Sequence, residues 1–192
     1  MVLVLFSGGV DSMLLAEQAH RANKLGRLLS IDYGQPAADQ ERAAAFKWAQ
    51  AHDYTLTEIP AHIRGVTEHM ATGVGSDGLR ILPGRNLLLL SHAMNVAKAT
   101  GCEEVWYGAN AGDRDYPDCT PGFVDLLNRI GAADTGVSVK APLLHLHKHD
   151  ILETAKLLGV DLDQAWSCYE PTAGGLPCGV CHSCLEGVSS ER

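Results

Sequence analysis

The sequence predicts an α/β fold: a doubly wound parallel five-stranded sheet with helices on both faces. Three observations predict it. Strand-like apolar runs alternate with helix-like runs along the first 160 residues. The first run, 2–6, is apolar at every position, as in a central strand covered on both faces. Polar or glycine-containing segments follow the strands, where parallel sheets bind ligands. We therefore expect an α/β domain over 1–160 and a separate small tail over 161–192.

The elements of this domain follow in order along the chain. Expected strands cover 2–6, 27–31, 54–59, 103–108 and 137–143. Expected helices cover 13–25, 36–52, 87–100 and 147–159, and one more begins at Thr120-Pro121. Gly26 and Gly101 stand where glycines end helices, and Asp11 or Ser12 can cap the first one. Phe46 and Trp48 should face the sheet. Between 60 and 82 the periodicity is lost, which indicates a loop.

A glycine-rich turn, Ser7-Gly8-Gly9-Val10-Asp11-Ser12, joins the first strand to the first helix. Its glycines allow the backbone to approach a ligand, and the helix N-terminus directs free N–H groups at it, which is an arrangement suited to phosphate. The turn lacks the Gly-Lys-Ser/Thr ending of the Walker loop. Beside a polyphosphate, Asp11 is expected as a helix cap or a Mg²⁺ ligand. The simpler alternative is an ordinary tight turn.

The overall charge restricts the classes of partner. The 15 basic and 23 acidic residues give a formal net charge of −8, which argues against a broad nucleic-acid surface. No apolar run, such as 2–6 or 87–90, approaches the length that crosses a membrane. The first residues lack the basic segment of a secretion signal, so we expect a cytoplasmic protein.

Four of the six cysteines lie in the last 25 residues: Cys168, Cys178, Cys181 and Cys184. Two Cys-x2-Cys spacings plus a fourth cysteine can close a tetrahedral shell, and four sulfurs in a closed shell are typical of structural Zn²⁺. An iron–sulfur cluster has the same ligand count, and unligated cysteines are the remaining alternative. We expect His182, crowded between two cysteines, to be exposed. A metal would supply the order that this short tail lacks.

The loop resembles the pyrophosphate loop of the ATP pyrophosphatases, and the motifs taken together resemble the 7-cyano-7-deazaguanine synthase family. The similarity runs from Leu5 to Cys184. Its pieces are Phe6 to Ser12, Asp32-Tyr33-Gly34-Gln35, Leu82-Pro83-Gly84-Arg85-Asn86, Tyr116-Pro117-Asp118-Cys119, Ala141 to Lys148, and Trp166-Ser167-Cys168-Tyr169 with the cysteines that follow.

The resemblance implies a reaction and its participants. An ATP-dependent ligase of this family converts 7-carboxy-7-deazaguanine and ammonia to 7-cyano-7-deazaguanine through adenylated intermediates, releasing AMP and pyrophosphate. Mg²⁺ accompanies the ATP, and a homodimer is expected. Adenylation turns a poor leaving oxygen into AMP, first from the acid and then from the amide. The protein's part is positioning and charge stabilisation.

The resemblance also implies residue roles. The nucleotide would bind to Phe6, Ser7, Gly8, Gly9, Val10, Asp11, Ser12, Asp32, Tyr33, Gly34 and Gln35. The deazaguanine would bind to Arg85, Asn86, Asn110, Asp113, Tyr116 and Asp118. The catalytic set would be Asp11, Ser12, Arg85 and Lys148, with Lys140 a weaker candidate. In the plainer alternative, Arg85 and Asn86 cap a helix, and Asp113 and Asp118 are turn residues.

Two segments depart from the family pattern. Pro36-Ala37-Ala38 replaces the usual basic residues, and Arg114-Asp115 replaces the usual Ser-Gly. Both flank the expected substrate site, so a variant that stops at 7-amido-7-deazaguanine or transfers the activated deazaguanine to another amine is a second hypothesis. A tRNA-acting enzyme with the same loop is disfavoured by the net charge. A further hypothesis, from a different class, is a zinc-stabilised nucleotide-binding module without catalysis. Cys119 could be a nucleophile, although adenylation explains the reaction without one.

Overall fold

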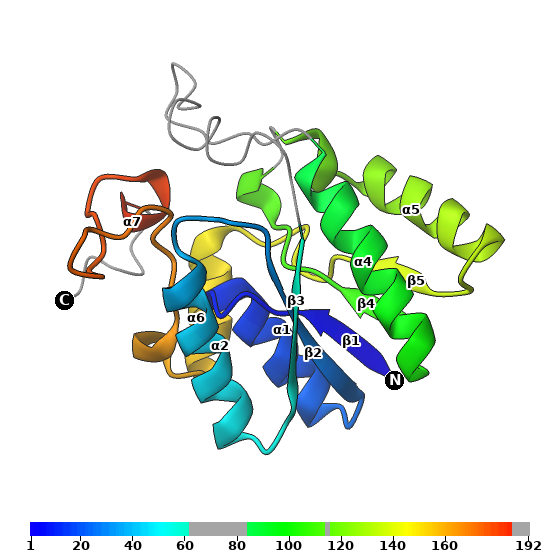
Figure 1. Cartoon of the computed structure of the whole chain (residues 1–192), viewed down its shortest axis with the longest axis horizontal. Coiled ribbons are helices and arrows are strands. Elements are labelled where there is room, and N and C mark those ends of the chain that lie inside the picture. Colours follow the sequence, from blue (N-terminus) through cyan, green and yellow to red (C-terminus); the bar gives the residue numbers. More distant parts are fainter. Residues whose placement is uncertain (62–83, 114–115, 186–192) are drawn as a thin grey trace.

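The computed structural model describes residues 1–61, 84–113 and 116–185. Most of the loop expected over 60–82, Leu82-Pro83 and the variant pair Arg114-Asp115 lie outside these ranges. Five strands form one all-parallel sheet in the order β3-β2-β1-β4-β5 (Figure 1). They are β1 (Val2–Leu5), β2 (Leu25–Asp32), β3 (Leu56–Pro60), β4 (Glu104–Trp106) and β5 (Ser138–Lys140).

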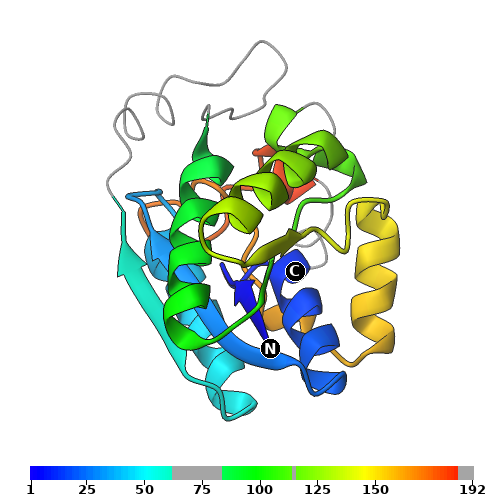
Figure 2. The ribbon, with the colours of Figure 1, turned by 90° about the vertical axis from the view of Figure 1, so that its right-hand side faces the viewer.

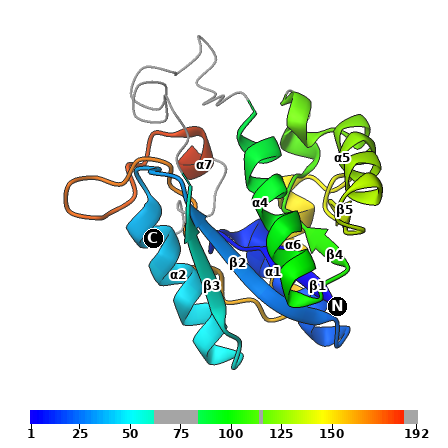
Figure 3. The same cartoon turned by 45° about the vertical axis from the view of Figure 1, so that its right-hand side comes forward.

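Helices cover both faces of the sheet, so the expected fold class is confirmed. One face carries α1 (Val10–Arg21), α2 (Ala38–Ala51) and α6 (Lys148–Leu157). The other carries α4 (Arg85–Thr100) and α5 (Pro121–Ala133). Figure 2 shows α4 and α5 in front of the strands, and Figure 3 shows α2 and α4 on opposite sides of the sheet.

The central strand is apolar throughout because it contributes to both cores. Val2, Val4 and Phe6 pack with α1, α2 and α6, whereas Leu3 packs with α4 and its neighbours. Successive side chains of a strand point to opposite faces, so a strand buried on both faces needs apolar residues at every position. The expectation for 2–6 therefore agrees with the packing.

The first helix lies earlier in the chain than expected, since it begins at Val10. It ends at Arg21, and Asn23 follows in a left-handed conformation with φ 53°. Leu25 and Gly26 belong to β2 instead, where Leu25 pairs with Val2. Gly26 is therefore not a helix-ending glycine. A Cβ at this position would lie 2.9 Å from that of Met1, so the strand has little room for a side chain there.

The boundaries and buried faces of the other helices agree with the expected ones in part. Helix α4 begins two residues early, so Arg85 and Asn86 lie in its first turn, and Gly101 ends it in the expected left-handed conformation. Thr120 caps α5 by accepting the Phe123 N–H. On α2 the Trp48 side chain is buried, but that of Phe46 is 59% exposed, which contradicts its expected position against the sheet.

The tail follows α6 through a short 3-10 turn, η3 (Leu162–Gln164), and its described part closes with α7 (His182–Leu185). It lies across the molecule from the N-terminus, at the carboxyl ends of the strands (Figure 1). The backbone N–H of Trp166 donates to the Gly8 carbonyl at 3.0 Å, which attaches the tail to the glycine-rich loop. Within the described residues, no helix combines the length and apolar character needed to cross a membrane.

Candidate active site

The glycine-rich loop is packed tightly between β1 and α2. Gly8 has φ +80°, and a Cβ there would lie 2.6 Å from the Glu41 carbonyl oxygen and 2.8 Å from the Ala45 nitrogen. The first helix begins at Val10 with Gly9 as its N-cap, and no side chain caps it. The expected capping by Asp11 or Ser12 is therefore wrong. The Ser12 hydroxyl instead donates to the Gly9 carbonyl at 2.9 Å, which leaves the first N–H groups of the helix without a side-chain cap.

This packing predicts a strong effect of Gly8→Ala. The left-handed backbone costs an alanine about 1–2 kcal/mol, and the close contacts add about 1–3 kcal/mol. The free energy of unfolding, measured by chemical denaturation, should therefore fall by about 2–5 kcal/mol. Gly34→Ala is the matched control, because Gly34 has φ +85° but nothing within 4 Å of a Cβ, so only the backbone cost applies. Equal losses for the two variants would contradict the close packing of α2 on the loop.

Asp11 projects from the first turn of α1 and forms an ion pair with Lys148. The Lys148 Nζ lies 3.0 Å from both carboxylate oxygens, and the two side chains are 22% and 19% exposed. Lys148 is the first residue of α6, whereas Asp11 follows β1. Gly108, just after β4, packs against Asp11, where an added Cβ would approach the Asp11 Cβ to 3.1 Å. Three segments thus meet at the switch point between β1 and β4.

A cavity of about 280 Å³ opens at these carboxyl ends. The sequence-predicted site residues that line it are Phe6, Ser7, Gly9, Asp11, Ser12, Tyr33, Gln35, Arg85, Asn86, Asp113 and Tyr116. The predicted residues outside the lining are Gly8, Val10, Asp32, Gly34, Asn110, Asp118 and Lys148. The glycine-rich loop, the turn after β2 and the start of α4 therefore converge on one cavity. Several of the predicted residues outside the lining contact residues that line it.

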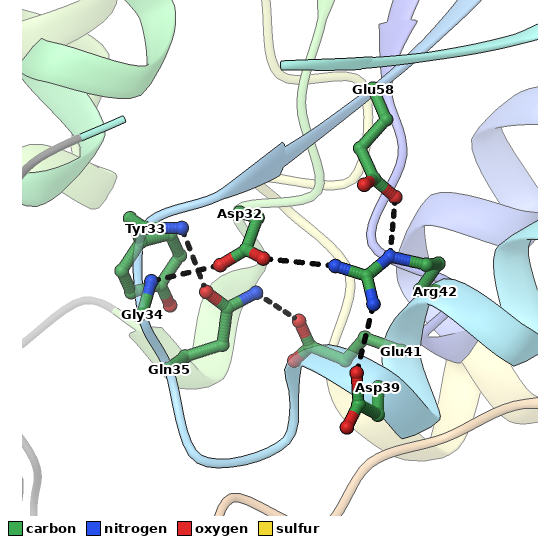
Figure 4. A network of polar contacts seen from close by, with 8 residues as sticks. All are labelled: Asp32, Tyr33, Gly34, Gln35, Asp39, Glu41, Arg42 and Glu58. Carbon is green, nitrogen blue, oxygen red and sulfur yellow. Dashed lines mark hydrogen bonds and ion pairs between the residues drawn. The ribbon is translucent and has the colours of Figure 1, made fainter. Parts of the chain in front are cut away.

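The turn after β2 is held by a polar network (Figure 4). The Asp32 carboxylate accepts the Gly34 N–H at 3.0 Å through one oxygen and the Arg42 guanidinium at 2.9 Å through the other. Arg42 also contacts Asp39 and Glu58. Asp32 therefore shapes the turn, and its two oxygens are already engaged away from the cavity.

Arg85 is surrounded by acidic and phenolic groups. Burial opposes its charge, but interactions with Tyr33, Asp118 and Tyr169, including a hydrogen bond with Tyr33, outweigh that effect, so the pKa of Arg85 is raised. Burial raises the pKa of the Tyr33 hydroxyl, and Arg85 acts in the opposite direction. Arg85 therefore stays cationic at the cavity wall, where an anionic ligand can reach it.

Several other polar residues predicted for the site form hydrogen bonds with backbone N–H groups. The Asn110 N–H donates to Asp113 at 3.1 Å, and the Asn110 side chain accepts the Gly112 N–H at 2.8 Å. Asp118 accepts the Asn86 N–H at 3.3 Å, near the start of α4. Asp113 thus holds a local turn, as in the plainer alternative, and also lines the cavity, whereas the Asp118 carboxylate contacts the first turn of α4, 32 positions away in the chain.

Sequence reasoning missed Glu41, which lines the cavity from α2. Burial raises the pKa of the Glu41 carboxyl to about 7, while a hydrogen bond from Gln35 and the charge of Arg85 act in the opposite direction. Tyr107 and Tyr169 were also missed as lining residues. The signal for Glu41 was its position one helical turn into α2, the helix that follows the Asp32–Gln35 motif.

Cys119 lines the cavity as a neutral thiol. Burial and the nearby Asp113 and Asp118 raise the pKa of Cys119 to about 12. Because the thiolate is the nucleophilic form, this environment does not suit nucleophilic catalysis. We expect Cys119→Ala to keep the rate of AMP formation within about threefold of the wild type, as measured in steady state. A covalent intermediate on Cys119, detected by mass spectrometry, would contradict this expectation.

The four tail cysteines form a compact group. Their sulfur atoms all lie within 4.8 Å of one another, with Cys168 and Cys184 buried. Backbone N–H groups point at two of them, from Cys178 to the Cys168 sulfur at 3.2 Å and from Cys181 to the Cys178 sulfur at 3.4 Å. Zn–S bonds of about 2.3 Å place tetrahedral sulfurs about 3.8 Å apart. The four residues therefore fit one metal ion, and His182 is exposed as expected.

The fold and loop together define an α/β enzyme of the pyrophosphate-loop class. A tRNA thiolase from Methanococcus maripaludis, solved with a [4Fe-4S] cluster, superposes with a TM-score of 0.55 at 16% identity, over 83% of this chain and 57% of that one. An NMN synthetase from Francisella tularensis superposes with a TM-score of 0.53 at 15% identity, over 94% and 69%. At these identities the likeness concerns the fold.

The sequence comparisons define the family. The family described as queuosine biosynthesis protein QueC matches residues 1–188. A 7-cyano-7-deazaguanine synthase of Rhizorhabdus wittichii is 36% identical over 95% of this chain and 86% of its own length. One of Novosphingobium aromaticivorans is 37% identical over 96% and 86%. The chain therefore belongs to the QueC family, which confirms the resemblance found in the motifs.

Proposed function

We propose that the protein is an ATP-dependent ligase that makes 7-cyano-7-deazaguanine from 7-carboxy-7-deazaguanine and ammonia, with AMP and pyrophosphate as the other products. One observation carries this proposal: in a member of the QueC family, the cavity is lined at once by the glycine-rich loop, by Arg85 and by the Tyr33–Gln35 turn. No observation on the described residues favours one of the other hypotheses over this one.

We assign different roles in this reaction to different residues of the site. The N-terminus of α1, with Gly9 and Ser12, is suited to bind the pyrophosphate portion of ATP. Arg85 is suited to an anionic oxygen of the nucleotide or the substrate carboxylate. Asp11 would hold Mg²⁺, and Lys148, 3.0 Å from Asp11, fixes the carboxylate and balances its charge. Bound Mg²⁺ would neutralise polyphosphate charge.

The four cysteines of the tail would hold one Zn²⁺ ion in a structural role. Their mutual separations suit a single tetrahedral ion, and no ligand position is left for substrate. A cubane iron–sulfur cluster binds each thiolate to a different iron and needs them farther apart. The tail brings Tyr169 to the cavity and Trp166 to the loop, so the metal would support the site at a distance. The homodimer and the cytoplasmic location remain predictions.

The decisive experiment incubates the purified protein with 7-carboxy-7-deazaguanine, ATP, Mg²⁺ and ammonium chloride, and follows the products by mass spectrometry. We expect the nitrile, with two AMP per nitrile formed. Accumulation of the amide as the end product would support the amide-forming alternative. No AMP in the presence of the deazaguanine acid would overturn the proposal.

A further inference from the structure

The packing of α2 determines which way the Glu41 side chain faces. It is on α2, whose next residue, Arg42, points away to Asp32, Asp39 and Glu58 (Figure 4). Glu41 itself lines the cavity together with the glycine-rich loop. A Cβ at Gly8 would lie 2.6 Å from the Glu41 carbonyl oxygen, so α2 packs directly on the loop at this residue. The packing of α2 on the loop therefore places Glu41 at the cavity, on the side of the glycine-rich loop.

Gln35 determines the orientation of the carboxyl group. The Gln35 side-chain oxygen accepts the Tyr33 N–H at 3.0 Å, so its amide nitrogen must face Glu41, and it donates to Glu41 Oε2 at 2.8 Å. A carboxylate and a neutral carboxylic acid can both accept this bond. Gln35 can therefore hold Glu41 in place before and after a proton transfer, while the described residues donate no hydrogen bond to the other oxygen, Oε1.

The proposed reaction must remove protons from nitrogen. When ammonia attacks the acyl adenylate, the C–N bond forms, the C–O bond to the phosphate breaks, and its electron pair leaves with AMP. The nitrogen then carries one proton too many. In the second half, the adenylated amide loses two protons from nitrogen as the second C–O bond breaks and C≡N forms. Both halves need a proton acceptor beside the same atom.

The other acidic groups that line the cavity are poorly suited to this task. Asp11 is paired with Lys148 through both oxygens, and Asp113 accepts the Asn110 N–H. Cys119 and Tyr107 have raised pKa values because they are buried. A general base is most effective when its pKa lies near the working pH, and the pKa of Glu41 is raised to about 7. The charged groups that act on it are Arg85 on α4 and Asp32 at the end of β2.

We propose that Glu41 is the proton acceptor for the reacting nitrogen, a catalytic role that rests on the proposed ligase function. It takes the proton from the nitrogen as AMP leaves in the amide-forming step, and one of the two protons lost when the nitrile forms. The other proton goes to solvent. Between the steps Glu41 returns its proton to water, so the reaction needs no further reactant.

The test compares Glu41→Gln with the wild type in rapid-quench single turnovers. Glutamine can still accept the Gln35 bond, so the fold should persist, as monitored by circular dichroism. We expect pyrophosphate release with the deazaguanine acid to stay within about threefold, while amide and nitrile formation slow by roughly 10²-fold or more. Asp39→Asn, in the same helix but exposed, should match the wild type in both. Wild-type protein that releases no pyrophosphate would instead refute the ligase function.

The pH profile provides a readout that a structural role would not move. At a fixed concentration of neutral ammonia, the wild-type rate of amide formation should fall as the pH drops below about 7, because Glu41 becomes protonated. That acidic limb should be absent in Glu41→Gln. Hydroxylamine, a stronger nucleophile that is neutral at pH 7, should restore much of the variant's rate as hydroxamate. An unchanged rate and profile in Glu41→Gln, with a working wild type, would overturn the proposal for Glu41 alone.

Discussion

Asp11→Asn is expected to lower kcat/KM for AMP formation by roughly 10²–10³-fold, because it removes a fixed charge placed where phosphate chemistry occurs. Asp11 accepts both contacts from Lys148 at 3.0 Å and lines the cavity directly after the phosphate loop. Asparagine preserves the shape but cannot bind Mg²⁺ as a carboxylate does. Steady-state AMP formation across a Mg²⁺ titration measures the effect, and a higher Mg²⁺ requirement should accompany the lower rate.

Asp11 could contribute by binding Mg²⁺ or by neutralising Lys148, and a double variant separates these two contributions. If Asp11 acts only by neutralising Lys148, the double variant Asp11→Asn/Lys148→Met should recover activity, because neither charge is then left unpaired. We expect no recovery. Glu153→Gln is the matched control, since Glu153 forms an exposed pair with His149 on the same helix and should leave the rate unchanged. Full activity of Asp11→Asn would show that the carboxylate is not part of the site.

Local signals in the sequence were enough to predict the sheet and the position of the cavity. The apolar run 2–6 and the glycine-rich loop predicted a central strand that leads into a phosphate site, and both interpretations needed only neighbouring residues. The first helix was placed too far along the chain because Leu25 and Gly26 fit a helix pattern equally well. The deciding contact, Leu25 beside Val2, joins residues far apart in the chain.

The contacts of the site depend on similarly distant residues. Asp11 and Lys148 were each predicted as functional, but their ion pair spans 137 positions, and nothing local to either residue indicates it. Glu41 was missed for the same reason: its carboxyl group matters because α2 packs on Gly8, which no helix periodicity reveals. Asp32 is the opposite case. Its motif predicted a nucleotide contact, but one carboxylate oxygen accepts the Gly34 N–H and the other contacts Arg42.

Cys181→Ala is expected to remove the bound metal and, with it, most of the activity. Three sulfurs cannot close the tetrahedral shell, and the tail has few other means of holding its conformation: it offers the cysteines, Trp166 against Gly8, and little apolar burial. Because Tyr169 lines the cavity and Trp166 supports the loop, loss of the metal should raise the KM for ATP as well as lower kcat. Elemental analysis should find about one zinc per wild-type chain and almost none in the variant.

Cys102→Ala is the matched control for the metal. Cys102 is buried against Gly26, far in the chain from the four tail cysteines and outside their group. Its replacement should cost stability through packing alone and leave the zinc content unchanged. Hydrogen exchange then locates the effect: protection should fall over 166–185 in Cys181→Ala but not in Cys102→Ala. A metal-free wild-type protein with normal protection over 166–185 and normal activity would refute the structural metal, because the tail would then hold the loop and Tyr169 in place without it.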